Sequence, residues 1–154
     1  MECEIKWNAG DGISFAAKTG SGHVIVLDTA KDFTEATAGP RPMEAFLVGA
    51  VACTQYDLVA GIKQSGGILR SCKACASGVR SEISPKIFTK ISVHFSIESD
   101  NISHEVIQEI LDASRDLHGS AMKMLGKTAK ISFDFELSTG NSLPHLQSNK
   151  IKKC

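Results

Sequence analysis

The sequence predicts an α+β fold in which strands and helices are segregated along the chain, in the order βββ-α-ββ-αα-β. Three observations support this prediction. Alternating residues mark strands before residue 30, a long apolar helix follows, and further strands surround two shorter helices. The 154 residues are enough for a single domain, expected at 1–137, followed by a polar, mobile tail at 138–154.

The N-terminal region is expected to form three short strands. Alternation of apolar and charged residues predicts a half-buried strand at 3–8. Strands at 13–18 and 23–28 follow, each preceded by a glycine-containing turn, so the three form a meander or paired hairpins.

A long helix is expected at 42–64, because Pro42 suits a first helical turn and two glycines follow Ser65. From Phe46 to Cys53 every residue is apolar or glycine, so no face is reserved for water. A helix that is hydrophobic all round is normally buried, and one chain of this size can scarcely cover all its faces. We therefore expect an obligate homodimer with these helices at its centre.

The second half of the chain is expected to contain two strands joined as a hairpin, two helices separated by a break, and a closing strand. Serine at 103 suits an N-cap, and Gly119 suits the break between the helices. In chain order these elements lie at 68–79, 88–98, 104–117, 120–126 and 129–137.

Composition limits the classes of partner. Seventeen basic residues balance seventeen acidic ones, so charge gives no argument for nucleic acid or an anionic membrane. The N-terminus lacks the pattern of a secretory signal, and the apolar run from Phe46 is too short to span a bilayer. We expect a soluble, cytoplasmic protein without nucleic-acid or membrane partners. Five cysteines, an odd number, argue for reduced thiols.

Cys72 and Cys75 have the spacing of a redox or zinc pair. They fall in a predicted strand, however, where residues three apart face opposite sides. No second pair exists to complete four metal ligands. We expect no metal, no cofactor and no paired function for these cysteines.

The stretch GPRPMEAFLVGAVACTQYDLVAGIKQSG resembles the central helix of the OsmC/Ohr family of small thiol-dependent hydroperoxide reductases, in its OsmC-like branch. Further similar segments are the Ser-Gly-His turn at 21–23, SPKIFTKISVHF at 84–95 and KMLGKTAKISFDFEL at 123–137. Within the helix, the residues that carry the resemblance are Pro42, Glu44, Gly49, Ala52 and Cys53.

The resemblance implies an intertwined homodimer, in which antiparallel sheets wrap around paired central helices and active sites lie at the subunit interface. Peroxidases of this family attack a hydroperoxide with the helix cysteine, which Cys53 matches. The resulting sulfenic acid forms a disulfide with a second cysteine on a later helix, and a dithiol reduces it.

Three departures from the family pattern affect the mechanism. Gly119 stands where the second, resolving cysteine would lie, and Met43 follows the proline where Ohr-type enzymes have glutamate. No arginine precedes Arg41, so the arginine that activates the thiol in Ohr-type enzymes has no counterpart. The fold is expected to carry over, but the two-cysteine mechanism is not.

Cys53 is either core packing or a reactive thiol in an apolar pocket. Asp57 lies one turn further along the helix, and both a carboxylate neighbour and burial disfavour a thiolate. A reactive Cys53 therefore needs a cation nearby. Candidates are Arg80, Arg41 or a lysine, from the same chain or from the partner chain of a dimer. Asp57 is expected to form a structural ion pair or to orient substrate.

Other candidate residues have two interpretations each. Glu44 can complement the helix N-terminus or take part in catalysis. Met43, Met122, His23 and His118 can border an apolar pocket, or serve as core and surface residues.

The leading hypothesis is a stress-response thiol peroxidase in which Cys53 reduces an organic hydroperoxide and an external thiol or dithiol resolves the sulfenic acid. The alternative is a non-catalytic dimer that keeps an apolar interface pocket for a lipid-like or aromatic ligand. A purely structural stress-induced dimer is the third possibility.

Overall fold

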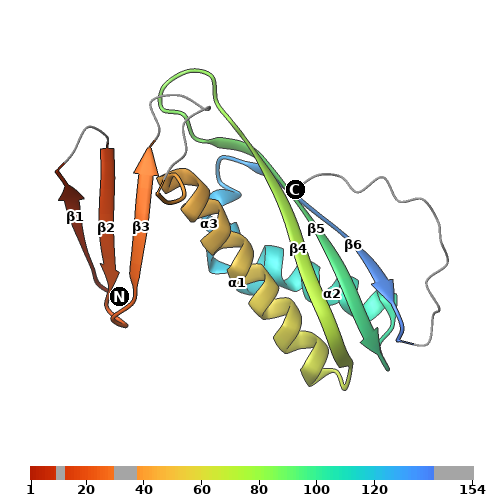
Figure 1. Cartoon of the computed structure of the whole chain (residues 1–154). Coiled ribbons are helices and arrows are strands. Elements are labelled where there is room, and N and C mark those ends of the chain that lie inside the picture. Colours follow the sequence, from red (N-terminus) through yellow and green to blue (C-terminus); the bar gives the residue numbers. More distant parts are fainter. Residues whose placement is uncertain (10–12, 30–37, 141–154) are drawn as a thin grey trace, which may run out of the picture. The chain divides into compact units, whose positions relative to one another are not determined.

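The structure is a computed structural model that describes residues 1–9, 13–29 and 38–140. Its elements follow the predicted order, with one π-helical turn added (Figure 1). The chain forms two compact units, Met1–Val48 and Gly49–Cys154, and the boundary between them falls inside the long helix. The predicted single domain at 1–137 stays a prediction.

The first unit contains an antiparallel three-stranded meander, as predicted. Its strands are β1 (Cys3–Asn8), β2 (Ile13–Thr19) and β3 (Val24–Thr29), in the order β1-β2-β3. Gly22 closes the turn between β2 and β3 with a φ of 89°, a conformation that glycine adopts without steric cost.

The second unit contains a sheet in the order β4-β5-β6, with β4 at Ile68–Arg80, β5 at Phe88–Asp100 and β6 at Lys130–Ser138. Strands β4 and β5 form the predicted antiparallel hairpin. Strand β6 is parallel to β5, so the expectation of purely antiparallel sheets is wrong for this pair. The helical connection between β5 and β6 returns the chain to the end of the sheet where β5 begins, as parallel pairing requires.

That connection contains α2 (His104–Ala113), a π-helical turn η1 (Ser114–His118) and α3 (Ser120–Leu125). The side chain of Ser103 accepts a hydrogen bond from the Val106 amide and caps α2, as predicted. The α-helix expected to reach residue 117 ends instead at Ala113, and the chain widens into the π-turn before it breaks at Gly119.

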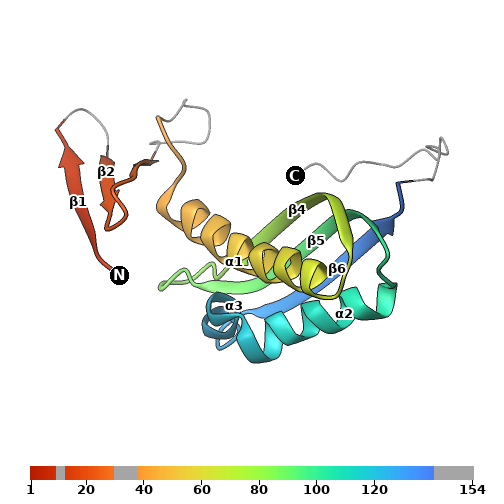
Figure 2. The same cartoon turned by 90° about the horizontal axis from the view of Figure 1, so that it is seen from below.

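The core of this unit lies between one face of the sheet and the helices (Figure 2). Helix α1 (Pro42–Gln64) packs closely on α2, because Gly61 has no side chain to keep Ile110 away. Alternate residues of β5 point into the core, and the intervening ones, including His94, point to the outer face. The buried β5 residues are Phe88, Ile91, Val93, Phe95, Ile97 and Ser99.

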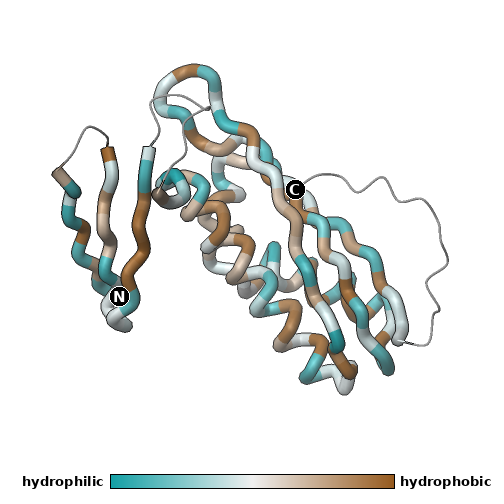
Figure 3. Tube along the Cα trace, in the orientation of Figure 1, coloured by the Kyte–Doolittle hydropathy of each residue, from teal (hydrophilic) through white to brown (hydrophobic). Residues whose placement is uncertain are grey.

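Among the described residues of the second unit, one side of α1 is buried. Figure 3 shows that much of this helix is apolar, yet Phe46, Val48 and Tyr56 are 49%, 66% and 74% exposed. These exposures agree with the expectation that one chain cannot cover every face of this helix. The length and apolar composition of α1 would also allow it to cross a membrane. The core helix of a water-soluble protein can have the same length and composition.

Candidate functional site

Cys53 lies at the middle of α1, on the face that points away from the sheet. Buried residues Ala50, Thr54 and Leu58 mark the inner face of the helix. Gly49, Cys53 and Tyr56 lie on the opposite face and are exposed. Cys53 is a free thiol that solvent reaches, so within one chain it does not serve as core packing.

Asp57, one turn after Cys53, binds a serine rather than a cation. The Ser114 hydroxyl donates a hydrogen bond of 2.7 Å to Oδ2 of Asp57. Ser114 is buried and begins the π-turn η1, whereas the Asp57 side chain is half-buried. The expected structural ion pair of Asp57 is therefore replaced by a hydrogen bond that joins α1 to η1.

Removal of the Ser114 hydroxyl should destabilise the fold, because Asp57 would lose its only protein hydrogen-bond donor among the described residues. We expect Ser114→Ala to lower the free energy of unfolding by about 1–3 kcal/mol, measured by urea denaturation. Ser132→Ala is the matched control, since that hydroxyl bonds Ser92 on an exposed face. Equal stability of the two variants would contradict this role of Ser114.

Gly119 stands where a side chain cannot fit. A Cβ atom placed there would lie 1.9 Å from the backbone oxygen of Ser114 and 3.2 Å from its hydroxyl. The φ of Gly119 is −71°, so the restriction is contact with the π-turn rather than a left-handed conformation. The same π-turn that supplies Ser114 to Asp57 therefore excludes a cysteine from this position.

The two candidate arginines have partners of their own. Arg80 donates from Nε to the carbonyl oxygen of Lys86 at 2.6 Å, within the β4–β5 hairpin. Arg41 pairs with Glu44 at 3.2 Å. Within the described part of the chain, no hydrogen bond or ion pair joins a cation to Cys53.

Glu44 caps the first turn of α1. Its Oε2 accepts a hydrogen bond of 2.9 Å from the Arg41 backbone amide, and its Oε1 pairs with the Arg41 side chain. A carboxylate at the third helical position that reaches back to the preceding amide is half of a capping box. The geometry supports the capping interpretation of Glu44.

The four expected pocket residues are not brought together. Met43 is half-buried on α1, and Nδ1 of His23 lies 3.1 Å from the Ser21 hydroxyl within its own exposed turn. His118 ends η1, but its side chain lies outside the described part of the structure. Met122 is buried.

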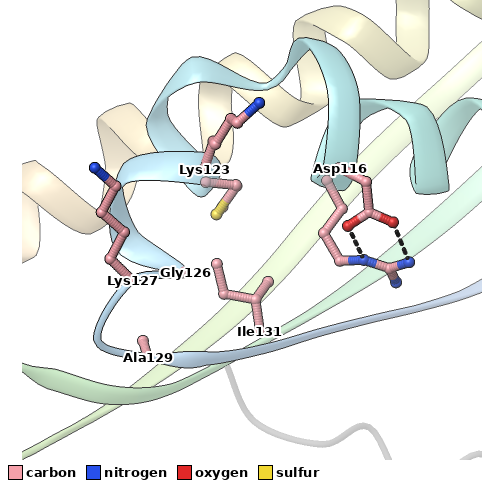
Figure 4. A pocket seen from close by; sticks show the side chains of 8 residues that line it. Asp116, Lys123, Gly126, Lys127, Ala129 and Ile131 are labelled. Atoms are coloured by element: carbon pink, nitrogen blue, oxygen red, sulfur yellow. Dashed lines mark hydrogen bonds and ion pairs between the residues drawn. The ribbon is translucent and has the colours of Figure 1, made fainter.

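Met122 does line a hollow of about 430 Å³ at the end of the second unit (Figure 4). Lys123 and Lys127 stand at its rim, and Asp116 is held there by two hydrogen bonds from Arg115. Cys53 does not line this hollow, so it is not the expected thiol pocket.

The other described cysteines differ in environment. Cys3 is an exposed free thiol, and Cys72 is a half-buried free thiol whose pKa is raised by burial. Cys75 is disulfide-bonded, so the expectation that all thiols are reduced is wrong for this residue. No group of three or more His, Cys, Asp or Glu side chains in the described residues is arranged to hold a metal ion.

Comparison of the sequence with known proteins finds a matching family and curated relatives. A sequence model described as OsmC-like protein matches residues 34–139. Protein YhfA of Escherichia coli strain K12 is 26% identical over 137 residues, covering 89% of this chain and 98% of YhfA.

Solved structures share the fold. An OsmC-like protein from Mycoplasma pneumoniae has a TM-score of 0.71 at 22% identity, over 89% of this chain and 97% of that one. An organic hydroperoxide resistance protein OsmC from Legionella pneumophila has a TM-score of 0.63 at 13% identity, over 88% and 96% of the two chains.

Proposed function

Because the chain belongs to the OsmC-like protein family, we propose that it is a stress-response hydroperoxide reductase in which Cys53 is the reacting group. The observation that carries this proposal is the exposed Cys53 thiol on an otherwise apolar helix face. Some structural neighbours are named for organic hydroperoxide resistance, which suggests the substrate class.

The chemistry needs one cysteine and an external reductant. The Cys53 thiolate attacks the terminal oxygen of an organic hydroperoxide, so that the O–O bond breaks, an alcohol leaves and a sulfenic acid remains. An external thiol then displaces water from the sulfenic acid to give a mixed disulfide. A second thiol restores Cys53 and carries the disulfide away.

With glycine at position 119, the scheme has to use one protein cysteine and an external thiol. The contact with Ser114 makes the position unsuitable for any side chain, whatever the reductant. We therefore propose that an external small thiol or dithiol resolves the sulfenic acid. We place the reaction in the cytoplasm, where such thiols are kept reduced.

A second copy of the chain would complete the site. The outer face of α1 leaves apolar side chains exposed, and so, separately, does the first sheet; exposed apolar surface of this kind marks interaction sites. We propose that two chains pair through these surfaces, so that Cys53 lies at an apolar interface and a cation from the partner can approach it. The exposed residues include Ile5, Trp7, Ile13, Val24, Phe46, Val48 and Tyr56.

Charge placed on the outer face of α1 should prevent pairing. We expect the unaltered protein to elute as a dimer in gel filtration at micromolar concentration, and Tyr56→Glu to elute as a monomer, because a carboxylate would be buried without a partner. Lys63→Glu, a charge change at an exposed position near the end of the same helix, is the control. A stable, well-folded monomer of the unaltered protein would contradict the proposal.

The alternative function is a non-catalytic dimer that binds an apolar ligand. Two observations favour it: the described residues place no cation on Cys53, and they allow no resolving cysteine at Gly119. Such a protein would keep the apolar face of α1 without using its thiol.

Consumption of cumene hydroperoxide by the purified protein with dithiothreitol separates the two functions. The reductase should consume the hydroperoxide faster than dithiothreitol alone and should regain its free thiol after each turnover. A rate equal to that of dithiothreitol alone would reject the reductase and leave the binding protein.

A further inference from the structure

The hollow at the end of the second unit is a concave surface with no part in the chemistry proposed for Cys53 (Figure 4). It lies between the helical segments η1 and α3 and the beginning of β6, and its volume is about 430 Å³. Pockets that hold small molecules commonly measure about 300–1,000 Å³. The hollow is therefore large enough for one small molecule.

The floor of the hollow is apolar. Met122 of α3 is 1% exposed, and Ala129, just before β6, is 6% exposed. Ile131 is half-buried and is paired with the buried Ile91 of β5, so it lies on the face of the sheet that the helices cover. A polar ligand group placed on this floor would lose its contacts with water without gaining hydrogen bonds. The floor therefore suits hydrocarbon.

The rim of the hollow is positively charged. Lys123 and Lys127, one helical turn apart in the sequence, both stand there with exposed side chains (Figure 4). Among the described residues, no hydrogen bond or ion pair involves either ammonium group. Each ammonium group can donate three hydrogen bonds, so the two lysines can bind one anionic group between them.

Asp116 lines the same hollow but does not cancel this charge, because Arg115 binds it. Nε and Nη2 of Arg115 donate hydrogen bonds of 2.9 and 2.8 Å to the two oxygens of Asp116, and Nη2 also lies 3.0 Å from Oδ1 of Asp112. The hydrogen bonds from Arg115 lower the pKa of Asp116, so its carboxylate stays ionised and paired. Within the described structure, the two lysines are the lining charges left without a partner.

Charge along β5 and β6 favours an anion at the same end of the sheet. The two strands are parallel, and Lys90 and Lys130 are paired where β6 begins, next to the hollow. Summed charges of one sign attract a ligand of the opposite sign. The acidic residues of these strands lie further along them, at Glu98, Asp100, Asp134 and Glu136.

We propose that the hollow binds a small amphiphilic anion, namely a carboxylate with a short hydrocarbon chain of the medium-chain fatty acid class. The carboxylate accepts hydrogen bonds from Lys123 and Lys127, and the chain lies on Met122 and Ile131. An ion without hydrocarbon would leave the floor uncovered, and hydrocarbon without charge would leave the lysines unpaired. The site is separate from Cys53, and binding needs no covalent step.

The order of the layers favours a free molecule over the headgroup of a membrane lipid. The apolar floor lies inside the hollow and the lysines stand at its rim. A free fatty acid can place its chain on the floor and its carboxylate at the rim. A lipid held in a bilayer presents its charged headgroup first and keeps its chains in the membrane, so it would leave the floor empty.

The test is an NMR titration of the whole protein that follows backbone amide signals. The probes are octanoate, 1-octanol and inorganic phosphate, which carry both features, hydrocarbon alone and charge alone. We expect octanoate to shift amides within residues 115–131 and to bind at least about tenfold more tightly than either other probe.

Three outcomes of the titration would overturn the proposal. The first is equally tight binding of 1-octanol or phosphate. The second is an octanoate response confined to α1 or to the first sheet. The third is co-sedimentation with phosphatidylglycerol vesicles without any octanoate response, which would assign the lysines to a membrane surface.

Variants connect binding to the rim and the floor. We expect Lys123→Gln and Lys127→Gln each to weaken octanoate binding about two- to fivefold, whereas Lys63→Gln, at an exposed position of α1, leaves it unchanged. Ile131→Thr keeps a β-branched strand residue but makes the floor polar, so it should also weaken binding. Cys53→Ser should have no effect, which separates this site from hydroperoxide reduction. Undiminished octanoate affinity in the double lysine variant would overturn the proposal.

Discussion

Replacement of Cys53 by serine is expected to lower dithiothreitol-dependent consumption of cumene hydroperoxide to the rate of dithiothreitol alone. A serine hydroxyl at this position cannot be oxidised to a sulfenic acid, so no covalent intermediate can form. The measurement compares initial rates at equal protein concentration after removal of the purification reductant.

Two control variants make this result specific. Cys3→Ser removes an exposed thiol on β1, and Cys72→Ser removes a half-buried thiol on β4. Both should keep the rate of the unaltered protein, because neither thiol lies on the apolar face of α1. Retained activity in Cys53→Ser, or loss of activity in Cys3→Ser, would place the reaction at another sulfur.

Substitution of Gly119 should have the largest effect on stability. A Cβ atom there would lie 1.9 Å from the Ser114 backbone oxygen, and a backbone atom cannot rotate out of the way as a side chain can. We expect Gly119→Ala to cost about 3 kcal/mol of unfolding free energy, which lowers the melting temperature by roughly 10 °C. Ser120→Ala, at the exposed start of α3, should change it by less than about 0.5 kcal/mol.

Gly119→Cys extends this test to the mechanism. It restores the cysteine that two-cysteine relatives are expected to carry, but we expect it to be as destabilised as Gly119→Ala and to form no disulfide with Cys53. Full stability together with a peroxide-induced disulfide between positions 53 and 119 would show that the π-turn does not exclude a resolving cysteine.

Most of the secondary structure could be predicted because it depends on local pattern. The limits of α1 follow from Pro42 and the glycines after Ser65, and the alternation in β5 identifies its buried face. The direction of β6 could not be predicted in this way. Alternation is the same in parallel and antiparallel strands, so only the path of the chain through α2 and α3 decides it.

The chemistry of the site depends on contacts between residues far apart in the chain, which local sequence patterns do not predict. Gly119 was recognisable as a break, but its contact with Ser114 arises from a π-turn without a sequence signature. The partner of Asp57 lies 57 residues away in the chain. The pairing of His94 with Asp134 can be recognised only when the register of β5 and β6 is known, although the alternation of β4 already assigns Cys72 and Cys75 to opposite faces.

The apolar pattern of α1 predicted more apolar surface than one chain can cover, and the exposed fractions of its side chains agree with this prediction. Ala50, Leu58 and Ile62 are buried against the sheet and α2, whereas Val48 and Tyr56 are exposed. One chain supplies a single sheet to this unit, and one sheet covers one face of a helix. The remaining apolar face is the reason to propose a second copy.

The proposed function requires Cys53 to react with hydroperoxide faster than any other thiol of the protein. It is tested most directly by a substoichiometric pulse of cumene hydroperoxide on the reduced protein, with sulfenic acids trapped and mapped by mass spectrometry at short times. We expect Cys53 to be labelled first and well before the exposed Cys3. Labelling that begins at Cys3 or Cys154 and leaves Cys53 unmodified would contradict it.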